Sequence, residues 1–236
     1  MQLAPPLGIF GGTFDPIHYG HILPILEAAG KTNIQKIALM PCYIPSHKNP
    51  ATASSEDRLK MVELVCADYP LFYPEPRELI RAKPTFSVDS LRELRTAMPN
   101  TPLCFFIGTD SLQNLFTWHN WPLLFALCHF VVCERTGEAV KDSSYKFDDS
   151  LGLPSPHSYS PELQTLLHKR QIFNPSVLHN TLAGHIYFAD TQRLTVSSSK
   201  IRQQLFNNQS VDSFLPPKIL DYIQQHKLYQ QSVDFC

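Results

Sequence analysis

Short apolar runs recur along the chain at wide spacing, separated by longer segments in which apolar residues repeat every three or four positions. Each run is too short for a helix and is bounded by turn residues, which is typical of strands buried in a parallel sheet. The runs cover residues 7–10, 36–40, 103–107, 130–133 and 185–189. Helical periodicity is found at residues 56–67 and 87–96, and again at residues 210–225, where Pro216 and Pro217 interrupt it. This alternation predicts an α/β fold with a Rossmann-like, doubly wound parallel sheet.

Composition favours one domain over residues 1–236, since 43% of the residues are hydrophobic and can bury a full core. The formal net charge of −1 and the pI of about 6.8 give no basic surface for nucleic acid or for an anionic membrane. No apolar run is long enough for a membrane helix, and the first residues lack the basic and apolar regions of a secretory signal. We therefore expect a cytoplasmic protein.

The segment 141–181 differs from the rest of the chain because it is rich in proline and serine and has little periodicity. It is predicted to be an insertion or a lid within the domain. The six cysteines occur singly, without any C-x-x-C pair, and several lie in apolar stretches. Reduced cysteines that pack in the core are the expectation.

Residues 11–21, which read GGTFDPIHYGH, follow the first predicted strand and have the character of a phosphate site. Adjacent glycines let the backbone approach an anion closely. If a helix begins near Tyr19, His18 and His21 share one face and point at the same ligand, while Gly20 lets a second segment pack tightly. The candidate phosphate-binding residues are Gly11, Gly12, Thr13, Phe14 and Gly20. Two histidines at this spacing could instead be half of a zinc site, but zinc would need further ligands at suitable spacing.

A second candidate phosphate site lies at residues 196–202, which read VSSSKIR. Ser197, Ser198 and Ser199 precede a predicted helix, so hydroxyls and free backbone N–H groups meet at a helix N-terminus, which favours anions. Arg202 in the first turn can reach a phosphate with its forked guanidinium. The alternative is a serine-rich cap followed by a solvated arginine.

Together the two segments resemble the G-x-[FYW]-[DN]-P-x-H-x-G-H and I-S-S-T-x-I-R motifs of the nucleotidylyltransferase superfamily. Their order and spacing are similar to its bacterial nicotinate-nucleotide adenylyltransferase branch. The resemblance implies transfer of AMP from ATP to nicotinate mononucleotide, giving deamido-NAD and pyrophosphate by in-line attack without a covalent enzyme intermediate. It implies that His21 stabilises the leaving phosphates and His18 the transferred one, with Mg²⁺ carried on ATP and no protein metal ligand.

The middle of the chain is expected to bind the adenosine and the acceptor. Residues 107–111 match the family's I-G-x-D-S pattern, in which Gly108 allows close backbone approach and Asp110 can bind a ribose hydroxyl. Residues 117–119 resemble its T-W-[YHK] motif, which implies that Trp118, next to His119, stacks on the pyridine ring. An indole at this position could also be an ordinary core residue.

Two further segments depart from the family's pattern. Residues 41–48 resemble P-x-x-x-P-P-H-K and supply His47 and Lys48, which either bind the acceptor or triphosphate or remain loop cations. In residues 84–87 the family's tyrosine is replaced by Phe86, while Thr85 and Ser87 keep hydroxyls for the acceptor. The family's R-x-x-M helix is matched at residues 58–61 and is expected to be mostly structural.

Three alternatives stay open at this point. The acceptor could be nicotinamide mononucleotide or phosphopantetheine, although the enzymes that use the latter are shorter. The protein could be a nucleotide-binding regulator without turnover, yet both motif histidines and Arg202 are present. It could be a fragment of a class I aminoacyl-tRNA synthetase, which would need a tRNA-binding domain and a basic surface. The sequence leaves the oligomeric state open.

Overall fold

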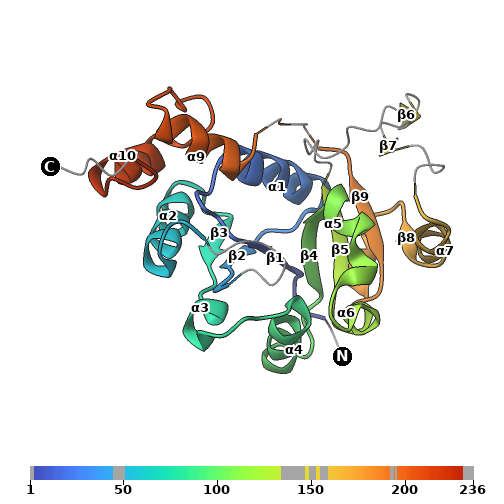
Figure 1. Cartoon of the computed structure of the whole chain (residues 1–236). Coiled ribbons are helices and arrows are strands. Elements are labelled where there is room, and N and C mark those ends of the chain that lie inside the picture. The colour runs from blue at the N-terminus through green and yellow to red at the C-terminus, as the bar shows by residue number, and fades with distance from the viewer. Residues whose placement is uncertain are drawn as a thin grey trace, which may run out of the picture. The chain divides into compact units, whose positions relative to one another are not determined.

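The computed structural model describes residues 3–44, 51–133, 147–148, 153–154, 159–191, 194 and 196–230 (Figure 1). Its strands are β1 (Leu7–Gly12), β2 (Ile37–Pro41), β3 (Phe72–Pro74), β4 (Leu103–Gly108), β5 (His129–Cys133), β6 (Phe147–Asp148), β7 (Leu153–Pro154), β8 (Gln171–Ile172) and β9 (Ile186–Ala189). Its helices are α1 (Tyr19–Thr32), α2 (Ser55–Asp68), α3 (Arg77–Arg81), α4 (Ser87–Ala97), α5 (Thr109–Gln113), the 3₁₀ turn η1 (Leu115–Thr117), α6 (Trp121–Leu127), α7 (Pro161–Arg170), α8 (Val177–Asn180), α9 (Ser198–Phe206) and α10 (Pro217–Gln225).

Seven strands form one sheet in the order β3-β2-β1-β4-β5-β9-β8, and β6 pairs with β7 in a separate antiparallel ladder. The pairs β1–β4, β4–β5, β5–β9 and β8–β9 are all parallel. Strands β2, β4 and β5 are buried along their whole length, as their continuous apolar runs predict. The order turns back between β1 and β4, which is the switch that defines a doubly wound sheet. The predicted fold class is confirmed.

The chain divides into two compact units, which consist of residues 1–10, 24–37 and 86–195, and of residues 11–23, 38–85 and 196–236. In the first unit, α4 packs on α6, and the aromatic side chains of Phe105, Phe125 and Phe130 contact one another in the core. In the second unit, α2 packs on β3 and on α10 (Figure 1). The prediction that residues 1–236 form one domain stays a prediction.

Most predicted elements begin and end within a few residues of the observed ones, but residues 210–225 do not form one helix. Only α10 is helical there, and it begins at Pro217. Proline fits the first position of a helix because the N–H that it lacks would have no intrahelical acceptor, so the proline pair starts the helix instead of interrupting it.

The proline-rich segment 141–181 lies partly outside the described residues. Within it, α7 and α8 are helical, and β8 pairs with β9, so Gln171 and Ile172 extend the main sheet. Strand β8 was not predicted, because two residues are too few to show an alternation of apolar and polar positions. That the rest of the segment is an insertion or lid stays a prediction.

Among the described residues, the cysteines outside any disulfide are Cys42, Cys66, Cys104, Cys128 and Cys133. Burial raises the pKa of Cys104 to about 12, and burial followed by the charge of Glu63 raises the pKa of Cys66 to about 12. Both thiols stay protonated at neutral pH and behave as packing groups, as expected. Across the part of the chain that the structure covers, no helix is long and apolar enough to cross a membrane.

Candidate functional site

Strand β1 ends at Gly12 and helix α1 begins at Tyr19, so the loop between them carries most of the first motif. His18 lies directly before the helix and is buried, with 3% of its surface exposed. The rings of His18 and His21 stack with their centroids 3.7 Å apart, and the edge of His21 faces Phe14 at 5.3 Å. The helix start predicted near Tyr19 therefore brings the two imidazoles together. An anion bound against them would meet donors from both rings.

Gly20 is the point at which the two motif segments meet. A Cβ atom at this position would lie 2.6 Å from Val196 Cγ1 and 3.0 Å from the ring of His18. No side chain larger than hydrogen fits there without a shift, because both neighbours are held close to the backbone. The second motif therefore packs directly on the start of α1, as the sequence predicted for Gly20.

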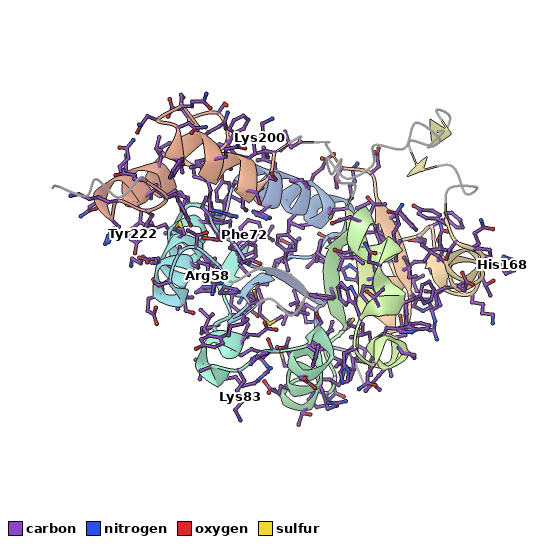
Figure 2. All side chains as sticks on the ribbon, in the orientation of Figure 1. Arg58, Phe72, Lys83, His168, Lys200 and Tyr222 are labelled. Atoms are coloured by element: carbon purple, nitrogen blue, oxygen red, sulfur yellow. The ribbon has the colours of Figure 1, made fainter. Side chains whose placement is uncertain are left out.

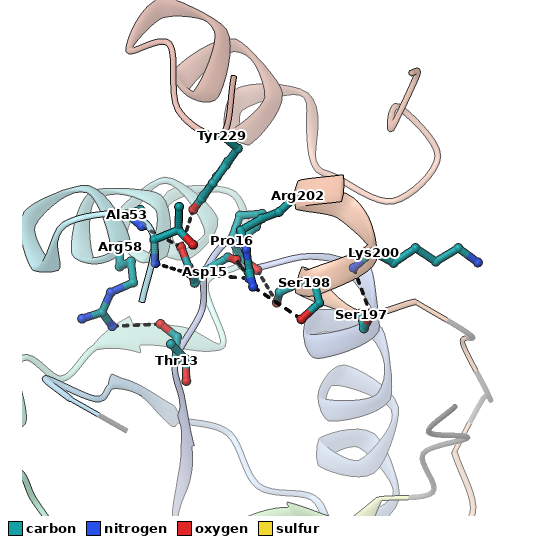
Figure 3. A network of polar contacts seen from close by, with 12 residues as sticks. Thr13, Asp15, Pro16, Ala53, Arg58, Ser197, Ser198, Lys200, Arg202 and Tyr229 are labelled. Atoms are coloured by element: carbon teal, nitrogen blue, oxygen red, sulfur yellow. Dashed lines mark hydrogen bonds and ion pairs between the residues drawn. The ribbon is translucent and has the colours of Figure 1, made fainter. Parts of the chain in front are cut away.

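The second motif starts helix α9. The Ser197 hydroxyl oxygen accepts a hydrogen bond from Lys200 N at 3.2 Å and caps the helix, and Ser198 Oγ donates to the Pro16 carbonyl oxygen at 3.0 Å. Lys200 is exposed and extends away from these contacts (Figures 2 and 3). A helix N-terminus with free backbone N–H groups thus lies against the first motif, which is the arrangement that binds anions.

Arg202 projects from α9 toward Asp15 (Figure 3). Its Nη1 donates to the Asp15 carbonyl oxygen at 2.6 Å and lies 3.4 Å from the carboxylate Oδ2, while Nη2 reaches Ser199 Oγ at 3.4 Å. The Arg202 side chain keeps 28% of its surface exposed. It is therefore held by protein groups, and the exposed part of its guanidinium keeps donors with which to bind a phosphate.

The candidate nucleoside residues lie in the other unit, where β4 runs into α5. Gly108 is the N-cap of α5 and has φ of −83°, a conformation open to any residue. Thr109 is buried, and Asp110 in the first turn is exposed. An exposed carboxylate at the carboxyl end of a parallel strand has access to a ligand hydroxyl, which fits the role expected of Asp110.

Trp118 follows η1 and is half-buried, with its ring edge on Phe105 at 6.1 Å. The next residue, His119, is exposed, and its ring contacts that of Phe86 in a tilted arrangement with the centroids 4.4 Å apart. Phe86, which replaces the family's tyrosine, thus packs on His119, a residue predicted to bind the acceptor substrate. Trp118 and His119 both keep ring surface on which a flat heterocycle could stack.

Thr85 is placed differently from what a ligand-binding hydroxyl would need. It is 8% exposed, and its Oγ1 donates at 2.8 Å to the carboxylate of Glu78, which is also buried. The hydroxyl proton of Thr85 is therefore used inside the protein. Ser87, at the first position of α4, is half-buried. His47 and Lys48 lie outside the described residues.

The comparisons with known proteins agree with this arrangement. The cytidylyltransferase-like family matches residues 9–204, a range that includes both motifs. The chain belongs to this family. Its sequence is 45% identical over 234 residues to a protein of Pseudoalteromonas atlantica described as "Probable nicotinate-nucleotide adenylyltransferase", with 99% of each chain covered. It is 39% identical to a protein of Aeromonas salmonicida with the same description, covering 97% of this chain and 99% of that one. The family resemblance seen in the two motifs is confirmed.

Two solved structures share the fold of this chain. A Plasmodium falciparum nicotinic acid mononucleotide adenylyltransferase complexed with NaAD superimposes with a TM-score of 0.65 at 18% sequence identity. The match covers 96% of this chain and 98% of that one. The same enzyme complexed with APC gives a TM-score of 0.63. At this identity the likeness shows the fold alone.

Two residues of this site make contacts that their sequence positions did not indicate, and the first is Arg58. Arg58 of α2 is 1% exposed (Figure 2). Its Nη1 donates to the carbonyl oxygens of Thr13 and Cys42 at 2.9 and 2.6 Å, and its Nη2 donates to that of Tyr43 at 3.0 Å. One buried guanidinium thus holds the loops that follow β1 and β2. The family's R-x-x-M pattern was the available signal, but spacing alone does not show which carbonyls an arginine reaches.

Asp15 is a second such residue. Its carboxylate is 4% exposed and accepts hydrogen bonds from the backbone N–H groups of Thr52 and Ala53, at 2.8 and 3.0 Å. These amides belong to the turn before α2, so Asp15 ties the first motif to a segment some forty positions later in the chain. From the sequence, Asp15 was only one position of the first motif, since the amides that it binds carry no side-chain signature.

Proposed function

We propose that the protein transfers the adenylyl group of ATP to nicotinate mononucleotide, a step of NAD biosynthesis. The observation that carries this proposal is the meeting of the two motifs, in which stacked His18 and His21, the N-terminus of α9 and Arg202 belong to one compact unit. The names of relatives that match over nearly their whole length support the same reaction and acceptor.

The reaction is an in-line displacement at the α-phosphorus. An oxygen of the acceptor phosphate forms a bond to that phosphorus, and the bond between it and the bridging oxygen of pyrophosphate breaks. No protein nucleophile is needed, so the enzyme contributes positioning and donors at the oxygens where negative charge grows. His21 is assigned to the leaving phosphates and His18 to the transferred phosphoryl group. ATP enters with Mg²⁺ on its phosphates, and no protein side chain is assigned to the metal.

The N-terminus of α9 and Arg202 bind the β- and γ-phosphates in this scheme. Ser198 already donates its proton to Pro16, so its contribution at the phosphate is the backbone N–H group. Ser197 uses its oxygen as the cap and keeps its hydroxyl proton to donate. Backbone groups at the end of β1 and in the loop that follows it are assigned to the same phosphates; they belong to Gly11, Gly12, Thr13 and Phe14. Ser199 accepts from Arg202 Nη2, so each of the three consecutive serines has its own task.

The acceptor is assigned to Trp118, His119 and Ser87, with His47 and Lys48 as cations for its phosphate. Trp118 stacks on the pyridine ring, and Asp110 binds a ribose hydroxyl of the nucleotide. Thr85, which was predicted to bind the acceptor, is given no direct contact with it in this scheme, because its hydroxyl donates to Glu78. Since ATP and pyridine mononucleotides are cytoplasmic metabolites, the enzyme is assigned to the cytoplasm.

The proposal is tested by incubating purified protein with Mg²⁺-ATP and, in separate reactions, nicotinate mononucleotide, nicotinamide mononucleotide or phosphopantetheine. We expect pyrophosphate release with the nicotinate form, accompanied by an equal amount of deamido-NAD. Faster release with another acceptor would keep the reaction and overturn the acceptor assignment. No release with any of the three would favour a nucleotide-binding protein without turnover.

A further inference from the structure

The segment after α10 returns to the first motif through one side chain, Tyr229. Its hydroxyl donates to Asp15 Oδ1 at 2.8 Å, and 9% of the tyrosine surface is exposed (Figure 3). The proposed reaction does not use this contact. It links residue 229 to residue 15 within one compact unit, and Asp15 in turn contacts Arg202.

The Asp15 carboxylate is divided between two sets of donors. Oδ1 accepts from Tyr229 and from Ala53 N, while Oδ2 accepts from Thr52 N and lies beside Arg202 Nη1. A carboxylate held by several donors cannot rotate freely, so the direction of Oδ2 is fixed by what holds Oδ1. Each oxygen thus accepts from one backbone amide, and the Tyr229 hydroxyl is the additional side-chain donor to Oδ1.

Two properties of Tyr229 support a specific role for its contact with Asp15: the phenol stays protonated, and the backbone is held in an unfavourable conformation. Burial, and then the charge of Asp15, raise the pKa of the Tyr229 phenol far above its usual range, so the phenol keeps its proton. Tyr229 also has φ of 62°, a left-handed conformation that is unfavourable for a bulky side chain. Such strain persists where the surrounding structure requires it, and here it accompanies the turn that directs the ring toward Asp15.

From this geometry we propose that Tyr229 is a positioning residue, which acts through Asp15 to hold Arg202 in register with the triphosphate of ATP. Tyr229 does not touch the substrate. Without this hydroxyl the carboxylate loses one of its donors and can turn, and Arg202 Nη1, which also donates to the Asp15 carbonyl oxygen, loses part of what fixes the direction of the guanidinium. This inference rests on the proposed role of Arg202 and deepens it.

The chain offers a matched control in Tyr222 of α10, whose hydroxyl donates to Asp57 Oδ1, also at 2.8 Å. Tyr222→Phe removes the same kind of bond, from a tyrosine to an aspartate in the same unit, but Asp57 has no contact with Arg202 among the hydrogen bonds and ion pairs of the described residues. The comparison of the two variants separates a loss of local stability from a loss of positioning.

The experiment measures the dissociation constants of ATP and of AMP by calorimetry for the wild type, Tyr229→Phe, Tyr222→Phe, Arg202→Ala and the double variant Tyr229→Phe/Arg202→Ala. Tyr229→Phe should raise the dissociation constant of ATP about fivefold, the order expected for one misaligned charged hydrogen bond. The dissociation constant of AMP should not change. Tyr222→Phe should change neither. The double variant should bind ATP as weakly as Arg202→Ala alone, since Tyr229 has nothing left to position.

Three results would overturn the inference: wild-type ATP affinity in Tyr229→Phe, an equal loss for ATP and AMP, or a double variant whose losses multiply. Thermal unfolding of both phenylalanine variants shows that each is folded at the binding temperature. Because binding is measured without an acceptor, these results do not depend on turnover. A wild-type protein that binds ATP but releases no pyrophosphate would contradict the proposed function and leave the positioning result standing.

Discussion

In the proposed reaction, the chemistry depends most directly on His18 and His21. Their rings stack at 3.7 Å beside the helix N-terminus that the second motif supplies. Donors fixed in this way contribute to catalysis when they meet charge that develops only in the transition state. The two histidines should therefore affect the rate of the chemical step more than the binding of substrate.

His21→Ala should lower kcat by about 100-fold or more and raise the KM for ATP much less, because an oxyanion donor acts mainly on the transition state. Steady-state kinetics of pyrophosphate release measure both constants. The control is His168→Ala, which removes an exposed histidine from α7 and should leave both unchanged. A near-normal kcat in His21→Ala would remove the catalytic assignment.

Trp118→Ala should raise the KM for the mononucleotide about tenfold and spare the KM for ATP, because stacking on an aromatic face contributes roughly 1–3 kcal/mol. Trp121→Ala is the matched control, since Trp121 packs on Phe116 and Phe125 and should lower the unfolding temperature without changing the acceptor KM. If the two variants gave the same unchanged acceptor KM, Trp118 would be a packing residue.

Single residues were predictable where a motif carries them and less so where a backbone group completes the contact. The histidine pair, Gly20 and Arg202 were all identified from spacing. That Thr85 donates to Glu78, or that Asp15 binds the amides of Thr52 and Ala53, could not be predicted, because these partners are brought together only by the fold.

Among the elements, we expect the formation of the site to depend on the close packing of the second motif against the start of α1. Two glycines of α1 allow this to be tested. Gly20 contacts Val196 and His18, whereas a Cβ added at Gly30 would meet nothing within 4 Å. Both positions are helical, so alanine has the same intrinsic advantage at each.

Gly30→Ala should raise the free energy of unfolding by about 0.5–1 kcal/mol and leave the rate of pyrophosphate release unchanged. Gly20→Ala should show no such gain, because overpacking costs roughly 1–3 kcal/mol, and it should lower the rate about tenfold or more by displacing the start of α9. Denaturant unfolding and kinetics on both variants decide the matter. Equal stability and activity in the two would show that Val196 moves aside freely.

The elements themselves followed from the hydrophobic pattern when they were long. The buried runs became β1, β2, β4, β5 and β9, and the periodic segments became α2 and α4. Strands β3 and β8 were not predicted. They are only three and two residues long, and their hydrogen bonds to neighbouring strands define them rather than a sequence pattern. The boundary of α10 was wrong because a proline pair signals a break and a helix start equally well.

At the scale of the whole molecule, stability should depend on pH through His129, which is fully buried in β5. Its Nε2 lies 2.8 Å from the Thr181 carbonyl oxygen and its Nδ1 accepts from His185 N at 3.2 Å, so the neutral ring satisfies both partners. Burial, opposed by the Thr181 bond and assisted by the charges of His185 and Arg95, lowers the pKa of His129 to about 4.

Above pH 6.5, His129 is neutral in both the folded and the unfolded chain. Between pH 6.5 and 4, only the unfolded chain binds the proton, so the free energy of unfolding should fall by about 3 kcal/mol across this window from His129 alone. Urea unfolding at several pH values measures the loss. His129→Gln should flatten this decline, whereas His168→Gln should keep it. A decline of the same size in both variants would show that His129 does not cause it.

The central claim, adenylyl transfer to nicotinate mononucleotide, is tested most directly by following the α-phosphorus of ATP. The protein is given Mg²⁺-ATP labelled at that atom together with equal amounts of nicotinate and nicotinamide mononucleotides, and the labelled dinucleotides are separated. The account predicts that the label enters deamido-NAD well ahead of NAD. Label that stays in ATP, or that enters the nicotinamide product first, would contradict it.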